Sequence, residues 1–144
     1  MFNKTIDERL SLWANHRRSL EVSDTPLEDA WEFWKLAPYV QYNNLLDPHY
    51  HQSWPSPWEI IVHNKYDDFT RAVMIGMTLK LTKRYKDSQI KIETYLDKTK
   101  TSVYNIVNID DIWLINYNDI GPVKFENLSE DFYLENIIKL EPPR

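Results

Sequence analysis

The residue types best suited to metal chemistry lie close together in the segment Asp47-Pro48-His49-Tyr50-His51. In an extended segment, His49 and His51 would place two imidazoles on one side, and Asp47 would add an oxygen ligand. Such a set would support a metal-dependent hydrolase or a metal-binding protein. Because two alternating histidines also occur incidentally in surface loops, we keep this metal site as an alternative interpretation.

The composition excludes several other kinds of site. The chain of 144 residues has no cysteine, which excludes disulfides, cysteine nucleophiles and thiolate metal ligands. Its two glycines, Gly76 and Gly121, are too few for a glycine-rich phosphate-binding loop. No apolar run is long enough to span a membrane, and no signal-peptide pattern is present. We therefore expect no cofactor and no membrane partner.

Three N-terminal capping patterns predict a helical first half. They are Thr5-Ile6-Asp7-Glu8, Thr25-Pro26-Leu27-Glu28 and Ser56-Pro57-Trp58-Glu59. They predict helices from residue 6 to about 20, from 26 to before Pro38, and from 57 to a break at 64–65. Residues 37–54, rich in Pro, Asn and Tyr, are expected to form an ordered loop across the body of the domain.

A long helix from about residue 66 is expected to be the centre of the fold. Between Ala72 and Leu81 it is apolar nearly all round, as in a helix buried on more than one side. Gly76 in its middle costs about 1 kcal/mol relative to Ala. We therefore expect another element to pack closely against this glycine.

The second half alternates in the manner of β-strands. Residues 89–96, 101–109 and 112–118 are rich in β-branched and aromatic residues, and the last two are joined by Asp110-Asp111 in an expected tight hairpin. Residues 123–125 are a candidate short fourth strand, and 131–140 fit either a closing helix or a terminal strand. The prediction is a single α+β domain over residues 1–144, with 1–85 mainly helical and 86–144 mainly β. An antiparallel sheet of three or four strands would place one face on the central helix and the other toward water or a partner.

Aromatic and charged side chains supply candidates for an interface with other proteins. The candidates are Trp31, Trp34, Tyr50, Trp54, Lys83, Arg84 and Lys86. Seven Lys or Arg stand against three Asp or Glu between residues 80 and 100, and eight Asp or Glu stand against two Lys between residues 110 and 141. Such asymmetry suits complementary docking between subunits. A net charge of −5 and the lack of a nucleic-acid-binding motif disfavour nucleic acid as the partner.

The segment from Trp54 to Asn118 resembles the core of the transglutaminase-like branch of the papain-type superfamily. In that family a Cys begins the central helix, a His lies on the following strand and an Asp ends the next strand. The corresponding blocks here are Tyr66-Asp67-Asp68-Phe69-Thr70, Ser102-Val103-Tyr104-Asn105-Ile106-Val107 and Trp113-Leu114-Ile115-Asn116-Tyr117. The resemblance puts the Cys position at Tyr66, the His position at Ser102 and the Asp position at Asn116 or Tyr117.

None of the three catalytic residue types is present at these positions. Acyl transfer of this kind needs a thiolate activated by an imidazole that a third group orients. Tyr66, with an ordinary pKa near 10, is a poor nucleophile at neutral pH, and Ser102 cannot shuttle a proton. The resemblance therefore implies a degenerate, non-enzymatic relative of the superfamily that is kept for its shape.

Taken together, these features favour a non-catalytic structural or connector protein within a large assembly. A chain rich in Asn, Ile, Lys and Tyr with almost no Gly is typical of an AT-rich genome such as that of a bacteriophage. The expected partners are other subunits of a phage particle, and the expected location is the virion, or the host cytoplasm during assembly. A monomeric cytoplasmic adaptor is a further alternative, and it differs only in its partners.

Overall fold

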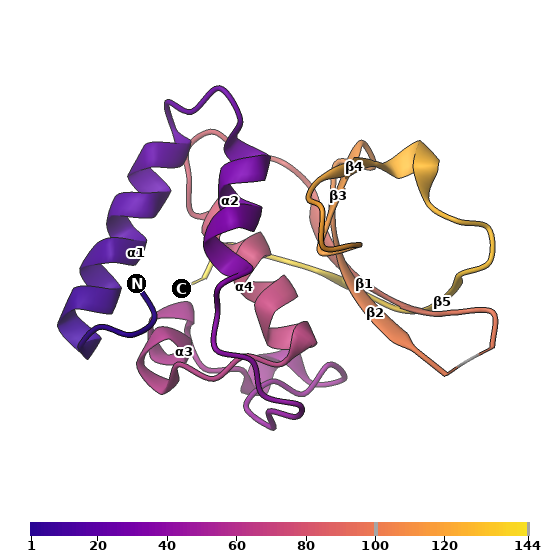
Figure 1. The fold of residues 1–144 in the computed structure, drawn as a ribbon, viewed down its shortest axis with the longest axis horizontal. Helices are drawn as coiled ribbons and strands as arrows, with labels where there is room; N and C mark the ends of the chain where they lie inside the picture. The colour runs from indigo at the N-terminus through magenta and orange to yellow at the C-terminus, as the bar shows by residue number, and fades with distance from the viewer. Residues whose placement is uncertain (100, 144) are drawn as a thin grey trace.

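The structure is a computed structural model that describes residues 1–99 and 101–143. Its helices are α1 (Ile6–Leu20), α2 (Pro26–Trp34), α3 (Pro57–His63) and α4 (Asp68–Lys80), with short 3-10 helices η1 (His51–Ser53) and η2 (Phe125–Asn127). Its strands are β1 (Ile90–Leu96), β2 (Val103–Ile109), β3 (Trp113–Ile115), β4 (Val123–Lys124) and β5 (Tyr133–Lys139). Helices precede strands, as predicted for an α+β chain (Figure 1).

Local capping explains where three of the helices begin. The Thr5 hydroxyl accepts the Glu8 N–H at the start of α1, and the Asp67 carboxylate accepts the Thr70 N–H at the start of α4. At Ser56 both arms of a capping box are formed at the start of α3. These side chains satisfy backbone donors that a helix leaves unpaired at its N-terminus.

The start of α2 is predicted correctly, but the side-chain cap expected at Thr25 is not formed. The Thr25 side chain makes no cap hydrogen bond, and its hydroxyl donates instead to Asp29 over 3.2 Å. Helix α2 still begins at Pro26, because proline lacks the N–H that would need a cap and its fixed φ suits the first helical turn.

Helix α4 is the centre of the fold, as its sequence predicted. It lies between the other helices and the sheet (Figure 1) and packs against α1, α2, β1 and β2. Its Thr78 hydroxyl accepts hydrogen bonds from the indole N–H groups of Trp13 and Trp34, each over 3.0 Å, and donates to the Met74 carbonyl. One buried hydroxyl therefore joins three helices.

The close approach expected at Gly76 is confirmed. A Cβ atom at this position would overlap the Leu140 side chain and lie 3.3 Å from Ile90 Cγ2. Leu140 follows β5, and its N–H donates to the Ile90 carbonyl. Glycine therefore lets the end of the sheet reach the surface of α4.

The sheet has five antiparallel strands in the order β4-β3-β2-β1-β5, one or two more than predicted. Residues 131–140 resolve into strand β5, which pairs with β1 so that Ile138 lies opposite Ile92. Between β2 and β3, Asp110 and Asp111 have φ values of 56° and 54°, and Ile112 N–H donates to the Ile109 carbonyl. The tight hairpin predicted there is thus formed by two residues that tolerate a positive φ.

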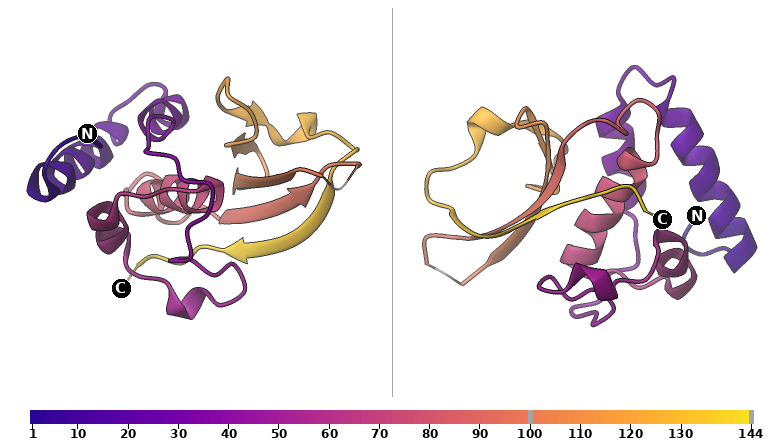
Figure 2. Two further views of the ribbon diagram at one scale, coloured as in Figure 1. Left: turned by 60° about the horizontal axis from the view of Figure 1, so that its bottom comes forward. Right: turned by 180° about the vertical axis from the view of Figure 1, so that it is seen from behind.

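The second face of the sheet, predicted to face water or a partner, is covered in part by the chain itself. The sheet curls, and the chain from β3 through η2 to β5 closes over this face (Figures 1 and 2). Tyr95, Ile106 and Leu114 form a second small core here, packed against partly buried side chains that include Tyr117 and Phe132. Burial of these residues needs the curled segment, which sequence periodicity alone does not reveal.

Within the described residues, no helix combines the length and the apolar character needed to cross a membrane.

Candidate functional site

Three elements meet at one polar junction, where α4 begins against β2 and the end of β3. The Asp68 carboxylate in the first turn of α4 accepts hydrogen bonds from the Asn105 backbone N–H (3.2 Å) and side-chain amide (3.0 Å). It also accepts from the Asn116 side-chain amide over 3.1 Å. The carboxylate therefore ties the helix N-terminus, where negative charge is favourable, to two strands.

Asn116 occupies an uncommon backbone conformation at this junction. It directly follows β3, with a φ of 69°, and is buried. Asn is among the few residues that adopt this left-handed region readily. Its amide group donates to the Asn105 carbonyl over 2.8 Å, while its side-chain oxygen accepts Arg71 Nε–H over 3.0 Å.

Arg71 completes the network from the next turn of α4. Its guanidinium pairs with Asp68 over 3.4 Å and lies over the ring of Trp31, 5.3 Å from the ring centroid. The segment after β3 also packs against this indole at Gly121, which has a φ of 141°. A Cβ atom at Gly121 would lie 3.5 Å from Trp31 Cδ1. The guanidinium is thus fixed by an anion, an amide and an aromatic face.

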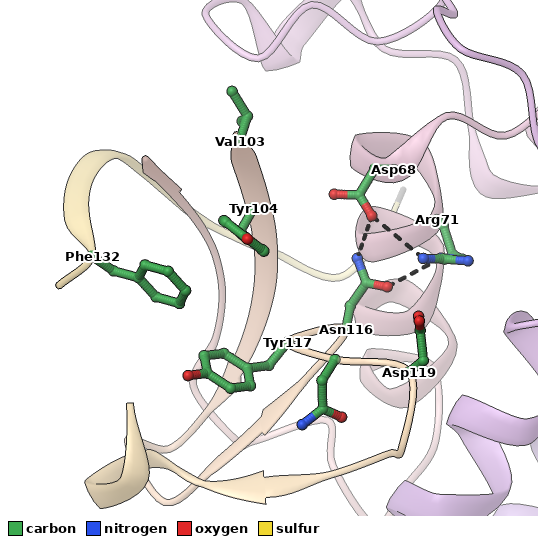
Figure 3. Close-up of a pocket in the computed structure, with 9 residues that line it drawn as sticks. Asp68, Arg71, Val103, Tyr104, Asn116, Tyr117, Asp119 and Phe132 are labelled. Carbon is green, nitrogen blue, oxygen red and sulfur yellow. Dashed lines mark hydrogen bonds and ion pairs between the residues drawn. The ribbon is translucent and has the colours of Figure 1, made fainter. Parts of the chain in front are cut away.

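A cavity of about 500 Å³ opens beside this network. Figure 3 shows Asp68, Arg71 and Asn116 on one side and the rings of Tyr104, Tyr117 and Phe132 on the other. The Phe132 ring centroid lies 4.7 Å from that of Tyr104 and 5.7 Å from that of Tyr117. Asp119 is exposed at the cavity wall. The cavity therefore combines an aromatic surface with a carboxylate that is accessible to solvent.

The structure does not bring together the residues predicted from the family resemblance. Tyr66 is buried on the helical side of the molecule, where its ring packs against Phe2 and Trp34, and burial raises the pKa of its phenol. Ser102 is exposed in the turn between β1 and β2, where it bonds to Asp97. Of the predicted positions, Asn116 lies at the junction and Tyr117 lines the cavity beside it.

Asp68, Arg71 and Asn105 were missed as site residues, although the sequence carries a signal for one of them. Asn105 alternates with Val107 and Ile109 on the side of β2 that faces α4. A polar residue in this apolar alternation indicates a partner on the facing helix. The partner is Asp68 in the first turn of α4, where a carboxylate is also favoured by the helix dipole.

The alternative metal site at Asp47, His49 and His51 is not assembled. Across residues 1–99 and 101–143, no group of three or more His, Cys, Asp or Glu side chains could hold a metal ion. The Asp47 carboxylate instead accepts the His49 backbone N–H in a local turn, and the His51 ring packs edge-on against Trp54. These contacts show that Asp47, His49 and His51 stabilise the local structure of the loop.

The predicted interface residues fall into two groups. Trp31 and Trp34 are buried in the core and are not available for docking. Trp54 is partly buried, with its indole N–H donating to the Asp47 carbonyl, whereas Tyr50 is 58% exposed. The tryptophans that cluster in the sequence therefore serve mainly to pack the core rather than to form an interface.

The basic segment is largely used within the chain. The Arg84 guanidinium donates to the carbonyls of Leu20 and Ser23 at the end of α1. The backbone N–H groups of Lys83 and Arg84 donate to the Glu21 carboxylate. Lys83 and Lys86 keep exposed side chains, so they are the part of the predicted basic surface that stays accessible.

Comparison with known proteins adds no relative: no family model matches the chain, and neither the curated proteins nor the solved structures include a significant match.

Proposed function

We propose that this chain is a non-catalytic docking module of a larger protein assembly, and that the cavity beside the start of α4 receives a segment of a neighbouring subunit. The observation that carries the proposal is the closed network of Asp68, Arg71, Asn105 and Asn116. Its amide and guanidinium groups hydrogen-bond to one another, which makes the junction a rigid wall.

The lining of the cavity supports docking better than acyl transfer. It holds Asp, Arg, Asn, Tyr, Val and Phe side chains, and none of them is a Cys, Ser or His that a neighbouring base could activate. Tyr66, at the nucleophile position of the resembled family, is kept protonated by burial. On this proposal the chain is a degenerate transglutaminase-like domain whose binding cavity lies beside Asn116 and Tyr117, while Tyr66 and Ser102 lie elsewhere.

The charges around the cavity favour a partner segment with a basic side chain. Two carboxylates, Asp68 and Asp119, face one guanidinium that is already paired, and the chain from residue 110 to 141 is strongly acidic. Beside them, the rings of Tyr104 and Tyr117 offer π faces to an ammonium or guanidinium group. Aromatic rings next to an accessible carboxylate are well suited to bind a Lys or Arg side chain.

The composition, rich in Asn, Ile, Lys and Tyr with two Gly, supports a bacteriophage particle as this assembly, with the host cytoplasm as the site of its construction. A monomeric cytoplasmic adaptor would use the same cavity with different partners, so the size of the native complex separates the two.

Reversing the cavity charge should weaken docking without unfolding the chain. We expect Asp119→Lys to lower retention of tagged protein on its native assembly by about tenfold, the equivalent of about 1.4 kcal/mol, because it places a cation where a basic partner side chain must bind. Retention is measured by quantitative mass spectrometry of purified assemblies.

Asp24→Lys is the matched control, since Asp24 is an exposed aspartate between α1 and α2, away from the cavity. It makes the same change in net charge and should leave retention unchanged. Equal retention of wild type, Asp119→Lys and Asp24→Lys would show that the cavity is not the docking site.

A further inference from the structure

Strand β5 forms an open edge of the sheet and carries exposed apolar side chains. It lies at one end of the sheet, next to β1. Large apolar side chains along it remain exposed: Tyr133 is 51% exposed, Leu134 49% and Ile137 47%. An exposed edge with unpaired N–H and C=O groups is a template for another strand.

The hydrogen bonding to β1 fixes which groups of β5 point outward. Leu140 N–H donates to the Ile90 carbonyl over 2.8 Å. Ile138 lies opposite Ile92 and Asn136 opposite Thr94, so every second residue of β5 turns its backbone groups toward β1. In an antiparallel pair, residues alternate between bonding to one neighbour and turning away from it. Ile137 and Lys139 therefore direct their backbone groups away from β1, to the free edge.

We propose that β5 pairs with β5 of a second copy of this chain, antiparallel about a two-fold axis at Ile137. In this register Ile137 lies opposite its own copy, and Glu135 of each chain lies opposite Lys139 of the other. The pairing joins two open edges, two exposed isoleucines and two opposite-charge pairs.

The charged residues favour this register over the two registers shifted by one residue. A shift that centres the pair on Asn136 places Lys139 opposite Tyr133 and loses both ion pairs. A shift that centres it on Ile138 places Glu135 opposite Glu141 of the second copy, which is repulsive. The bulge between Leu134 and Asn136 limits the regular part of the edge and so limits longer shifts.

The pairing is separate from the cavity and does not depend on the proposed docking there. It would give the assembly a symmetric pair of modules, each with its own cavity accessible. A second copy is the occupant that supplies both the matching edge and the matching charges.

Because the chain has no cysteine, a single introduced cysteine reports on this pairing directly. We expect Ile137→Cys in the purified full-length chain to be linked into a dimer by a short bismaleimide. Val22→Cys is the control, since Val22 is 84% exposed in the connection between α1 and α2 and is not part of the sheet. It should give at least tenfold less linked dimer at the same protein concentration.

Charge variants test the register without the cysteine. Lys139→Glu alone should reduce the dimer fraction measured by analytical ultracentrifugation, and the swap Glu135→Lys with Lys139→Glu should restore it. Circular dichroism of each variant checks that the fold is retained. A wild-type chain that stays monomeric at all concentrations, equal linking at residues 22 and 137, or no rescue by the swap would overturn the proposal.

Discussion

Replacing Thr78 with valine should lower the free energy of unfolding by about 2–6 kcal/mol, even though the two side chains have nearly the same shape. The Thr78 hydroxyl accepts the indole N–H groups of Trp13 and Trp34 inside the core. Valine would leave both buried donors without a partner, at about 1–3 kcal/mol each. Urea unfolding followed by tryptophan fluorescence measures the loss.

The same helix supplies a matched control. The Thr70 hydroxyl is buried on α4 and has no hydrogen-bond partner among the described residues. Thr70→Val therefore removes an unsatisfied polar group and should be neutral or slightly stabilising. Thr78→Ser, which keeps the hydroxyl, should lose less than Thr78→Val. If the two valine variants lose equal stability, Thr78 is not the polar link between the three helices.

Acidification should destabilise the chain through His16. Burial lowers the pKa of His16 from 6.5 to about 4, against a smaller opposing effect of Asp29. The ring stacks on Phe33 with centroids 3.9 Å apart, and its Nε2 is buried without a partner among the described residues. A charged imidazole is therefore disfavoured in the folded chain.

The sign of the effect follows from proton uptake. Between pH 6.5 and about 4 the unfolded chain binds a proton at His16 that the folded chain does not, so the free energy of unfolding decreases as the pH falls through this window. The loss should be about 1–3 kcal/mol, reduced from the full linkage value because part of the ring is exposed. Urea unfolding at a series of pH values measures it.

Variants separate His16 from the carboxylates that titrate in the same range. His16→Leu should flatten the stability profile between pH 4 and 6.5 relative to wild type. His63→Gln, which changes an exposed histidine at the end of α3, should leave the profile unchanged. Parallel profiles for wild type and His16→Leu would mean that burial does not affect His16 as described.

The helical half was readable from sequence because its signals are local. The predicted capping residues Thr5 and Ser56 each act within one turn, and the apolar surface of α4 is visible in its own sequence. Gly76 also predicted a close contact correctly, although nothing in the sequence identified Leu140 as the group that makes it.

Strand β5 and the curl of the sheet depend on distant partners. The apolar positions of residues 131–140 fit a helix or a strand, and the open edge of β1 decides for a strand. The site was harder still, since Asp68, Asn105 and Asn116 come from three elements and meet only because β2 and β3 pair beside the first turn of α4. The positions taken from the family resemblance, Tyr66 and Ser102, lie two and three residues before Asp68 and Asn105, and their side chains do not reach the junction.

The size and composition of the native complex test the docking proposal most directly. The protein is purified from its native source and analysed by size-exclusion chromatography with light scattering, and mass spectrometry identifies the proteins that elute with it. The proposal predicts recovery within a large particle, bound to other structural proteins. Recovery as a free monomer with no associated protein would contradict it.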